Sequence, residues 1–230
     1  MRKKKAGYNW YKLLLCGLVF FVIGGTAFCM AAESKESAEK RAEAEAERKA
    51  EEAAERKAEE AARARKESLS LVPGVPAGTL EPDQDEKIVY LTFDDGPSEN
   101  TQRILDILKE YDVKATFFIT GAKENCRPLI KKAYEAGHTI GLHTYSHDYS
   151  DVYSSEEAYF KDLEKVGKVA EEQIGFVPYL IRFPGGSSNV VSAKYSQGIM
   201  SRLTEKVQEK GYQYYDWNVD SGDGGGAGID

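Results

Sequence analysis

The stretch Tyr90-Leu-Thr-Phe-Asp-Asp-Gly-Pro97 decides the fold that this sequence predicts. Its hydrophobic residues indicate a buried strand, and two carboxylates, Asp94 and Asp95, follow where that strand ends in a Gly-Pro turn. Carboxylates at such a position are costly to desolvate unless a cation, a proton or a hydrogen-bond donor meets them. The alternative is an ordinary Asp-Gly turn after a strand. The residues further along the chain decide between the two interpretations.

Strand and helix patterns alternate from this stretch onward, and three of the predicted helices end at a glycine, Gly137, Gly175 or Gly211. Strands are predicted at 87–93, 114–120, 139–142, 179–183 and 212–219. Helices are predicted at 101–111, 128–136, 156–174 and 195–210. Such alternation predicts an α/β fold with a parallel sheet, open or closed into a barrel, and chemistry at the C-terminal ends of the strands.

The N-terminal third has a different composition. A basic tail at 1–12 precedes residues 13–32, which carry no charge and predict a transmembrane signal anchor with the rest of the chain outside the cell membrane. The alternative is a cleaved signal peptide and a secreted protein. Residues 33–68, rich in Ala, Glu, Lys and Arg, predict a solitary helical stalk, with a weak coiled coil as the alternative.

Prolines and glycines at 69–86 predict a linker, which leaves 87–230 as the folded domain. The formal net charge of -7 gives no sign of a nucleic-acid surface, and nothing in the sequence implies a protein partner.

A second polar group is Gly141-Leu-His-Thr-Tyr-Ser-His147. His143 and His147 are four residues apart, so that one helical turn would bring both imidazoles to one face. Two imidazoles and one carboxylate suit zinc, with cobalt or another divalent ion as alternatives. His138, at a helix exit, is interpreted as structural.

Two further groups lie where predicted strands end. In Ile181-Arg-Phe-Pro-Gly-Gly186, Arg182 needs a carboxylate partner if it is buried, and the alternative is a surface arginine beside a turn. The last group, Asp216-Trp-Asn-Val-Asp-Ser-Gly-Asp223, again places acids after a strand.

In this order, TFDDGP, HTYSH, RFPGG and WNVDSGD resemble the motifs of the polysaccharide deacetylases of the NodB-homology type, carbohydrate esterase family 4. The resemblance covers residues 87 to 230 and implies a distorted (β/α) barrel. With the N-terminal segments, the chain looks like a membrane-anchored peptidoglycan N-acetylglucosamine deacetylase, a hydrolase acting on amide bonds of cell-wall glycan.

The resemblance also implies roles for individual residues. Asp94 matches the catalytic base, Arg182 the arginine that orients it, and Asp223 the acid that supports a general-acid histidine. The metal ligands of the family match Asp95, His143 and His147. Pro184 and Gly185 match the substrate and oxyanion turn.

The chain departs from the family pattern at three places. Gly185 stands where the family commonly has an aromatic residue, and Gly224 stands where it often has Trp. No histidine follows Asp223, so that the general-acid histidine has no counterpart in this chain and the barrel is expected to be incomplete at its C-terminus.

Three functional hypotheses follow. The first is a metal-dependent deacetylase, with slow turnover in this chain. The second is a catalytically dead, membrane-tethered glycan-binding protein, and the third is that the stalk acts as a scaffold. The complete set of predicted metal ligands favours the first. The exact glycan, and whether the target is N- or O-acetyl, stay open.

Overall fold

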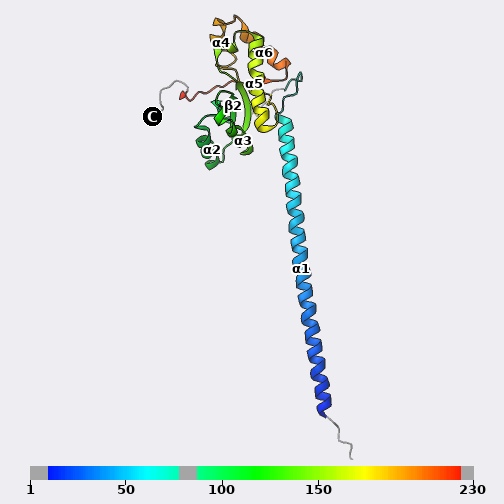
Figure 1. The fold of residues 1–230 in the computed structure, drawn as a ribbon. Coiled ribbons are helices and arrows are strands. Elements are labelled where there is room, and N and C mark those ends of the chain that lie inside the picture. Colours follow the sequence, from blue (N-terminus) through cyan, green and yellow to red (C-terminus); the bar gives the residue numbers. More distant parts are fainter. Residues whose placement is uncertain (1–9, 78–86, 224–230) are drawn as a thin grey trace, which may run out of the picture. The chain divides into compact units, whose positions relative to one another are not determined.

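The computed structural model describes residues 10–77 and 87–223 (Figure 1), and for 10–34 and Glu36 it describes the helical backbone alone. Predictions that fall on 1–9, 78–86 and 224–230, and on the side chains of 13–32, lie outside this part of the chain. The chain divides into two compact units, Met1–Arg63 and Ala64–Asp230.

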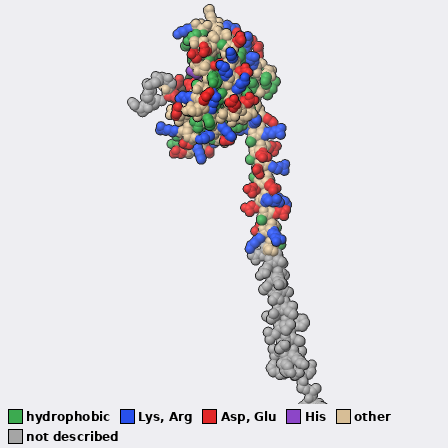
Figure 2. Space-filling model, viewed as in Figure 1, with side chains coloured by type: hydrophobic (Ala, Val, Ile, Leu, Met, Phe, Trp, Pro, Cys, Tyr) green, Lys and Arg blue, Asp and Glu red, His purple; other side chains and the backbone are tan. Residues whose placement is uncertain are grey.

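The first unit is formed by the long helix α1, Trp10–Leu69, which continues for six residues into the second unit. Its described side chains from Ser37 to Ala64 are all exposed, and acidic and basic groups alternate along it (Figure 2). Ion pairs four residues apart support the helix, as between Lys49 and Glu45 at 2.6 Å. No face of this part is apolar, which is typical of a helix surrounded by solvent.

The predicted single-pass membrane localisation requires a correction, and the side chains of 13–32 themselves lie outside the described residues. Where the structure describes side chains, no helix is apolar over a length sufficient to cross a membrane. A crossing helix needs about 20 predominantly apolar residues, whereas the described side chains of α1 are mostly charged residues and alanine. This finding contradicts the predicted single-pass membrane localisation.

The second unit is built on a parallel sheet of five described strands in the order β1-β2-β3-β4-β5. The strands are β1 Thr92–Gly96, β2 Thr116–Thr120, β3 Thr139–Thr144, β4 Leu180–Ile181 and β5 Gln213–Tyr214. The helices are α2 Thr101–Glu110, α3 Pro128–Glu135, α4 Tyr149–Val152, α5 Glu156–Ile174 and α6 Ile199–Glu209, with short 3₁₀ turns at Glu124–Cys126 and Val191–Lys194. The predicted parallel α/β fold is confirmed, and it is consistent with a NodB-type barrel.

Local signals define most of the helix ends. At the start of α5, the Ser155 side chain accepts a hydrogen bond from the Ala158 N–H, and Gly175 ends the helix with φ +78°. Helix α5 lies across β3 with its apolar face, and buried side chains such as Leu163 and Val166 join the core cluster. The helix thereby fixes the strand that carries His143.

The predicted buried strand at 87–93 is wrong for residues 87–91, which are exposed and precede the strand. β1 begins at Thr92, and the side chains before it are exposed, 89% for Val89 and 67% for Tyr90. β1 pairs with β2 alone among the described strands, so that the residues ahead of Thr92 lack neighbours on their outer side. Their apolar composition predicted burial that the sheet edge does not supply.

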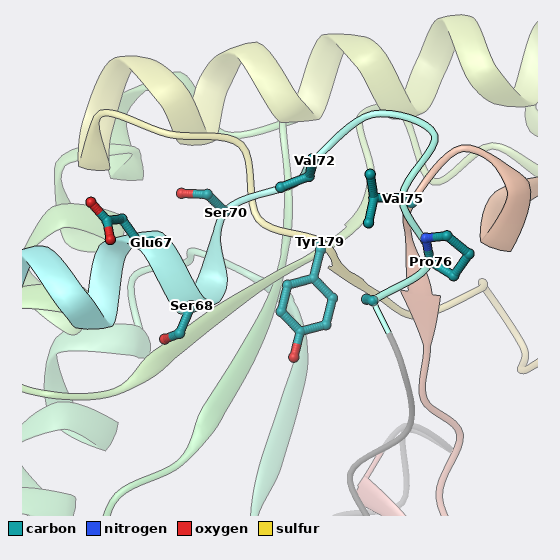
Figure 3. Close-up of a pocket in the computed structure, with 9 residues that line it drawn as sticks. Glu67, Ser68, Ser70, Val72, Val75, Pro76 and Tyr179 are labelled. Carbon is teal, nitrogen blue, oxygen red and sulfur yellow. The ribbon is translucent and has the colours of Figure 1, made fainter.

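The compact unit also includes residues that the sequence analysis assigned to stalk and linker. The Leu71 N–H donates to the Val177 carbonyl at 2.7 Å, and the Tyr179 N–H donates to the Leu69 carbonyl at 3.1 Å. Arg65 lies over the Tyr134 ring at 4.3 Å. A pocket of about 190 Å³ lies between residues 67–77 and Tyr179, and Figure 3 shows side chains that line it. Backbone and side-chain bonds therefore attach the segment 64–76 to the sheet.

His138 makes the stability of this unit depend on pH. Burial lowers the pKa of the imidazole, with the charges of Lys114 and Arg65 acting in the same direction, and Nδ1 accepts a hydrogen bond from the Ala115 N–H at 3.2 Å. The unfolded chain takes up a proton below about pH 6.5, whereas the folded chain resists it. The free energy of unfolding should therefore be highest above that pH and fall as the pH decreases from 7 to 5.

Urea unfolding at several pH values measures this dependence. His138→Asn, which retains a side-chain acceptor but does not titrate, should flatten the decrease. Parallel curves for the two proteins would show that other groups cause it.

Candidate metal centre and active site

The predicted site residues lie at or just after the C-terminal ends of neighbouring strands. A bulge between Phe93 and Gly96 interrupts the pairing of β1 with β2, and it contains Asp94 and Asp95. Because of this bulge, the two adjacent carboxylates reach different partners: Asp94 an arginine, and Asp95 two histidines.

The structure brings Asp95, His143 and His147 together. Asp95 Oδ1 lies 3.4 Å from His143 Nε2 and 3.2 Å from His147 Nε2. One ligand atom from each residue lies within 4.8 Å of the other two. His143 is buried, His147 is half-buried and Asp95 is exposed, so that one side of the cluster stays open to solvent and substrate.

The hydrogen bond of His143 defines which ring atom faces the cluster. Its Nδ1 lies 2.7 Å from the Arg182 carbonyl oxygen, which can only accept, so Nδ1 carries the proton. Burial lowers the pKa of His143, although Asp94 and Asp95 act in the opposite direction. A neutral ring then presents the lone pair of Nε2 to a carboxylate oxygen. Two imidazole nitrogens and a carboxylate oxygen at these distances form a ligand set that fits a divalent metal ion.

Backbone strain accompanies two of the three ligands. Asp95 and His147 have positive φ angles of 64° and 56°, an arrangement shared among the described non-glycine residues by Asp112 alone. Such conformations persist where surrounding contacts enforce them and are frequent at functional sites. The predicted helical turn between the histidines is wrong: His143 belongs to β3, and His147 follows it in an irregular turn.

Arg182 forms the second half of the site. Its Nη1 donates to Asp94 Oδ1 at 2.9 Å and to Thr92 Oγ1 at 2.7 Å, while Nε donates to the Tyr215 carbonyl at 2.8 Å. The guanidinium is buried, and Nη2 also donates to the Asp216 carbonyl. A buried charge with this many partners is held in one position, and it holds Asp94 beside the candidate metal site, hereafter called the metal cluster, of Asp95, His143 and His147.

A glycine in β3 supports this arginine. The Arg182 guanidinium lies 4.2 Å from the centre of the Phe118 ring. A Cβ added to Gly141 would lie 2.5 Å from the same ring. The absence of a side chain at 141 therefore makes room for Phe118, and Phe118 in turn supports Arg182.

Pro184 and Gly185 lie in the turn that follows β4. The Pro184 carbonyl accepts hydrogen bonds from Tyr153 Oη at 2.8 Å and from Asn189 Nδ2 at 3.2 Å. Gly185 has φ +74°, and a Cβ added there would lie 2.6 Å from Tyr149 Oη. The space beside Gly185, which stands where the family commonly has an aromatic residue, therefore contains the Tyr149 hydroxyl.

Of the last group of acids, Asp216 contacts the site and Asp223 does not. Asp216 contacts the turn after β4, where Oδ1 accepts from the Ser187 N–H at 2.9 Å. Asp223, which the resemblance matches to the acid that supports a general-acid histidine, is exposed and accepts a hydrogen bond from Ser221 Oγ at 2.6 Å. Within the described residues, no contact joins Asp223 to Asp94, Arg182 or the metal cluster.

Sequence reasoning missed Tyr149, Phe118 and Asp216 as neighbours of the site. The sequence offered weak signals: Tyr149 follows His147 by two residues, and Asp216 opens the last acidic group. Phe118 gave none, because an aromatic residue inside an apolar strand predicts core packing and nothing more.

Comparisons with known proteins agree with this geometry. The sequence profile of the polysaccharide deacetylase family matches residues 81–202. A peptidoglycan-N-acetylglucosamine deacetylase of Bacillus cereus is 36% identical over 139 residues, which cover 60% of this chain and 48% of that protein. A second Bacillus cereus protein of that name is 34% identical over 66% of this chain and 67% of its own length.

Solved structures show the same relationship. The catalytic domain of a peptidoglycan N-acetylglucosamine deacetylase from Eubacterium rectale is 46% identical, with a TM-score of 0.62 over 64% of this chain and 67% of that one. The chain spans about half the length of the polysaccharide deacetylase YheN of Bacillus subtilis, to which it is 35% identical, and of the first Bacillus cereus protein, 55% and 48% respectively. The family profile covers more than half of the present chain. This chain belongs to the polysaccharide deacetylase family.

Proposed function

We propose that this chain is a metal-dependent hydrolase that removes the acetyl group from N-acetylglucosamine residues of peptidoglycan. The observation that carries the proposal is the pairing of two adjacent carboxylates with different partners. Asp95 faces the two histidines, and Asp94 is held by Arg182 beside them. A binding module needs neither a metal cluster nor a separately positioned carboxylate.

Asp95, His143 and His147 would hold the ion, for which zinc is the first choice and cobalt or another divalent ion the alternative. When bound, such an ion polarises an acyl carbonyl and lowers the pKa of water. Asp94, oriented by Arg182, takes the proton from the attacking water as general base. The proton is then available to the departing amine nitrogen, so that acetate and a free amino sugar result.

The turn after β4 is proposed to bind the reacting carbonyl. Within the described residues, the Gly185 N–H donates to no backbone carbonyl, and it is therefore free to donate to the oxyanion that develops during attack. Pro184 is fixed by two hydrogen bonds to its carbonyl. Asp223 is proposed to support the general acid of the reaction, the role that its match to the family motif implies.

The test is acetate release from chitopentaose and from isolated peptidoglycan, measured before and after removal of metal with a chelator. The expected result is activity that chelation abolishes and that Zn²⁺ or Co²⁺ restores. Release that survives complete chelation would overturn the metal dependence. Glycan binding without any release in the presence of metal would favour the glycan-binding hypothesis instead. An O-acetylated xylan, assayed in parallel, separates amide from ester substrates.

A further inference from the structure

The two histidines of the metal cluster are joined by a turn that has little regular structure of its own. β3 ends at Thr144, and His147 adopts a left-handed backbone conformation three residues later. A non-glycine residue in that region is costly and stays there only if neighbouring contacts enforce it. The position of the His147 imidazole therefore depends on what holds residues 145–147.

The contact that holds this turn is a buried carboxylate on α5. Asp162 Oδ1 accepts a hydrogen bond from the Tyr145 N–H at 2.5 Å, and Oδ2 accepts one from the Ser146 N–H at 3.2 Å. The residue is 7% exposed, and within the described residues no ion pair to it is found. Two consecutive backbone donors thus satisfy a carboxylate that would otherwise be expensive to bury.

The other side of the turn is bound to the sheet. The Gly121 N–H donates to the Tyr145 carbonyl at 3.1 Å, just past the end of β2. The turn is therefore held from β2 on one side and from α5 on the other. His143 is fixed separately, through its Nδ1 hydrogen bond to the Arg182 carbonyl, so each histidine has its own support.

We propose that Asp162 is a positioning residue of the metal centre, which fixes the turn between the histidines so that His147 Nε2 meets the ion beside His143 Nε2. The proposal rests on the metal-dependent function above. Asp162 itself does not contact the ion. Loss of such an outer partner typically reduces metal affinity by about 10- to 100-fold.

Asp162→Asn is the informative variant because it keeps the size of the side chain. The amide oxygen can accept one of the two hydrogen bonds, but the amide nitrogen is a donor and faces the second backbone N–H. Asp162→Glu keeps both acceptors on a longer stem and serves as the second variant if the first does not fold. Val169→Ala, in the buried part of the same helix, is the control for lost stability without any change at the turn.

The measurements are the Kd for Co²⁺, the visible absorption spectrum of bound Co²⁺, and the Tm of the metal-free proteins. The spectrum reports the geometry around the ion. For Asp162→Asn we expect binding weaker by about 10- to 100-fold and an altered spectrum, with Asp162→Glu between it and the wild type. Val169→Ala should lower Tm and leave both metal readouts unchanged.

If Asp162→Asn has the wild-type Kd for Co²⁺ and the wild-type spectrum, the proposal is overturned and Asp162 has a purely structural role, whatever the Tm. If only Asp162→Glu folds, the same result in that variant overturns it. An equal loss of metal affinity in Val169→Ala would also overturn it, because general destabilisation would then explain the effect. If the wild-type chain itself binds no Co²⁺ or Zn²⁺, the proposed metal centre fails and this proposal fails with it.

Discussion

Asp94→Asn should reduce kcat for acetate release by about 10²- to 10⁴-fold, the range typical of a lost general base. The amide cannot take a proton from water at neutral pH, whereas it keeps the shape of the carboxylate and one oxygen for Arg182 Nη1. The three metal ligands are unchanged, so the Kd for Co²⁺ should stay within a few-fold of the wild-type value. Single-turnover assays and metal titration together separate the two effects.

The matched control is Asp106→Asn, an exposed aspartate on α2 whose carboxylate accepts a hydrogen bond from Gln102. This variant should retain wild-type kcat. A kcat for Asp94→Asn within tenfold of the wild-type value would show that another residue serves as the base. Loss of metal binding in Asp94→Asn would instead assign Asp94 to the ligand set.

His143→Ala should abolish metal-dependent activity and weaken Co²⁺ binding by more than about 100-fold, the upper end of the effect of an outer partner. The His143 ring is almost fully buried and supplies the Nε2 atom that completes the cluster with Asp95 and His147. Its removal leaves two ligands, one of which is an exposed carboxylate. Isothermal titration with Zn²⁺ and acetate release measure the two consequences.

The control variant is made at His138, the histidine that lies outside the metal cluster. His138 is also buried, but it contacts the Ala115 N–H and takes no part in the cluster. His138→Asn should therefore change the pH dependence of stability while leaving the Kd for Zn²⁺ unchanged. Equal losses of Zn²⁺ affinity in both variants would show that the loss in His143→Ala comes from damaged folding and not from a missing ligand.

Much of the site was predictable because parallel strands present their C-terminal ends at one edge of a sheet. The sequence places polar groups directly after four apolar runs, and the structure brings Asp94, Asp95, His143 and Arg182 together at that edge. The predicted helix at 156–174, ended by Gly175, coincides with α5. These features are local, so that neighbouring residues suffice to define them.

Other features depended on contacts between distant segments. The apolar residues before Thr92 predicted burial, yet they lie exposed at the edge of the described sheet. The spacing of the histidines predicted a helical turn, but β3 continues through His143 because it pairs with β2 and β4. The predicted single-pass membrane localisation is contradicted, because no helix whose side chains are described is long and apolar enough to cross a membrane.

The sequence by itself determined the α/β alternation, the ends of most helices, and the identities of the residues that gather at the metal cluster. The tertiary structure alone decided that Phe118 and Gly141 support Arg182, that Tyr149 lies beside Gly185, and that Asp162 holds the turn before His147. The physical reason is the separation along the sequence of the residues that interact. Helix caps and apolar runs act within a few residues, whereas the direction of a side chain at a strand end depends on a bulge, a packed ring or a buried carboxylate supplied by another part of the chain.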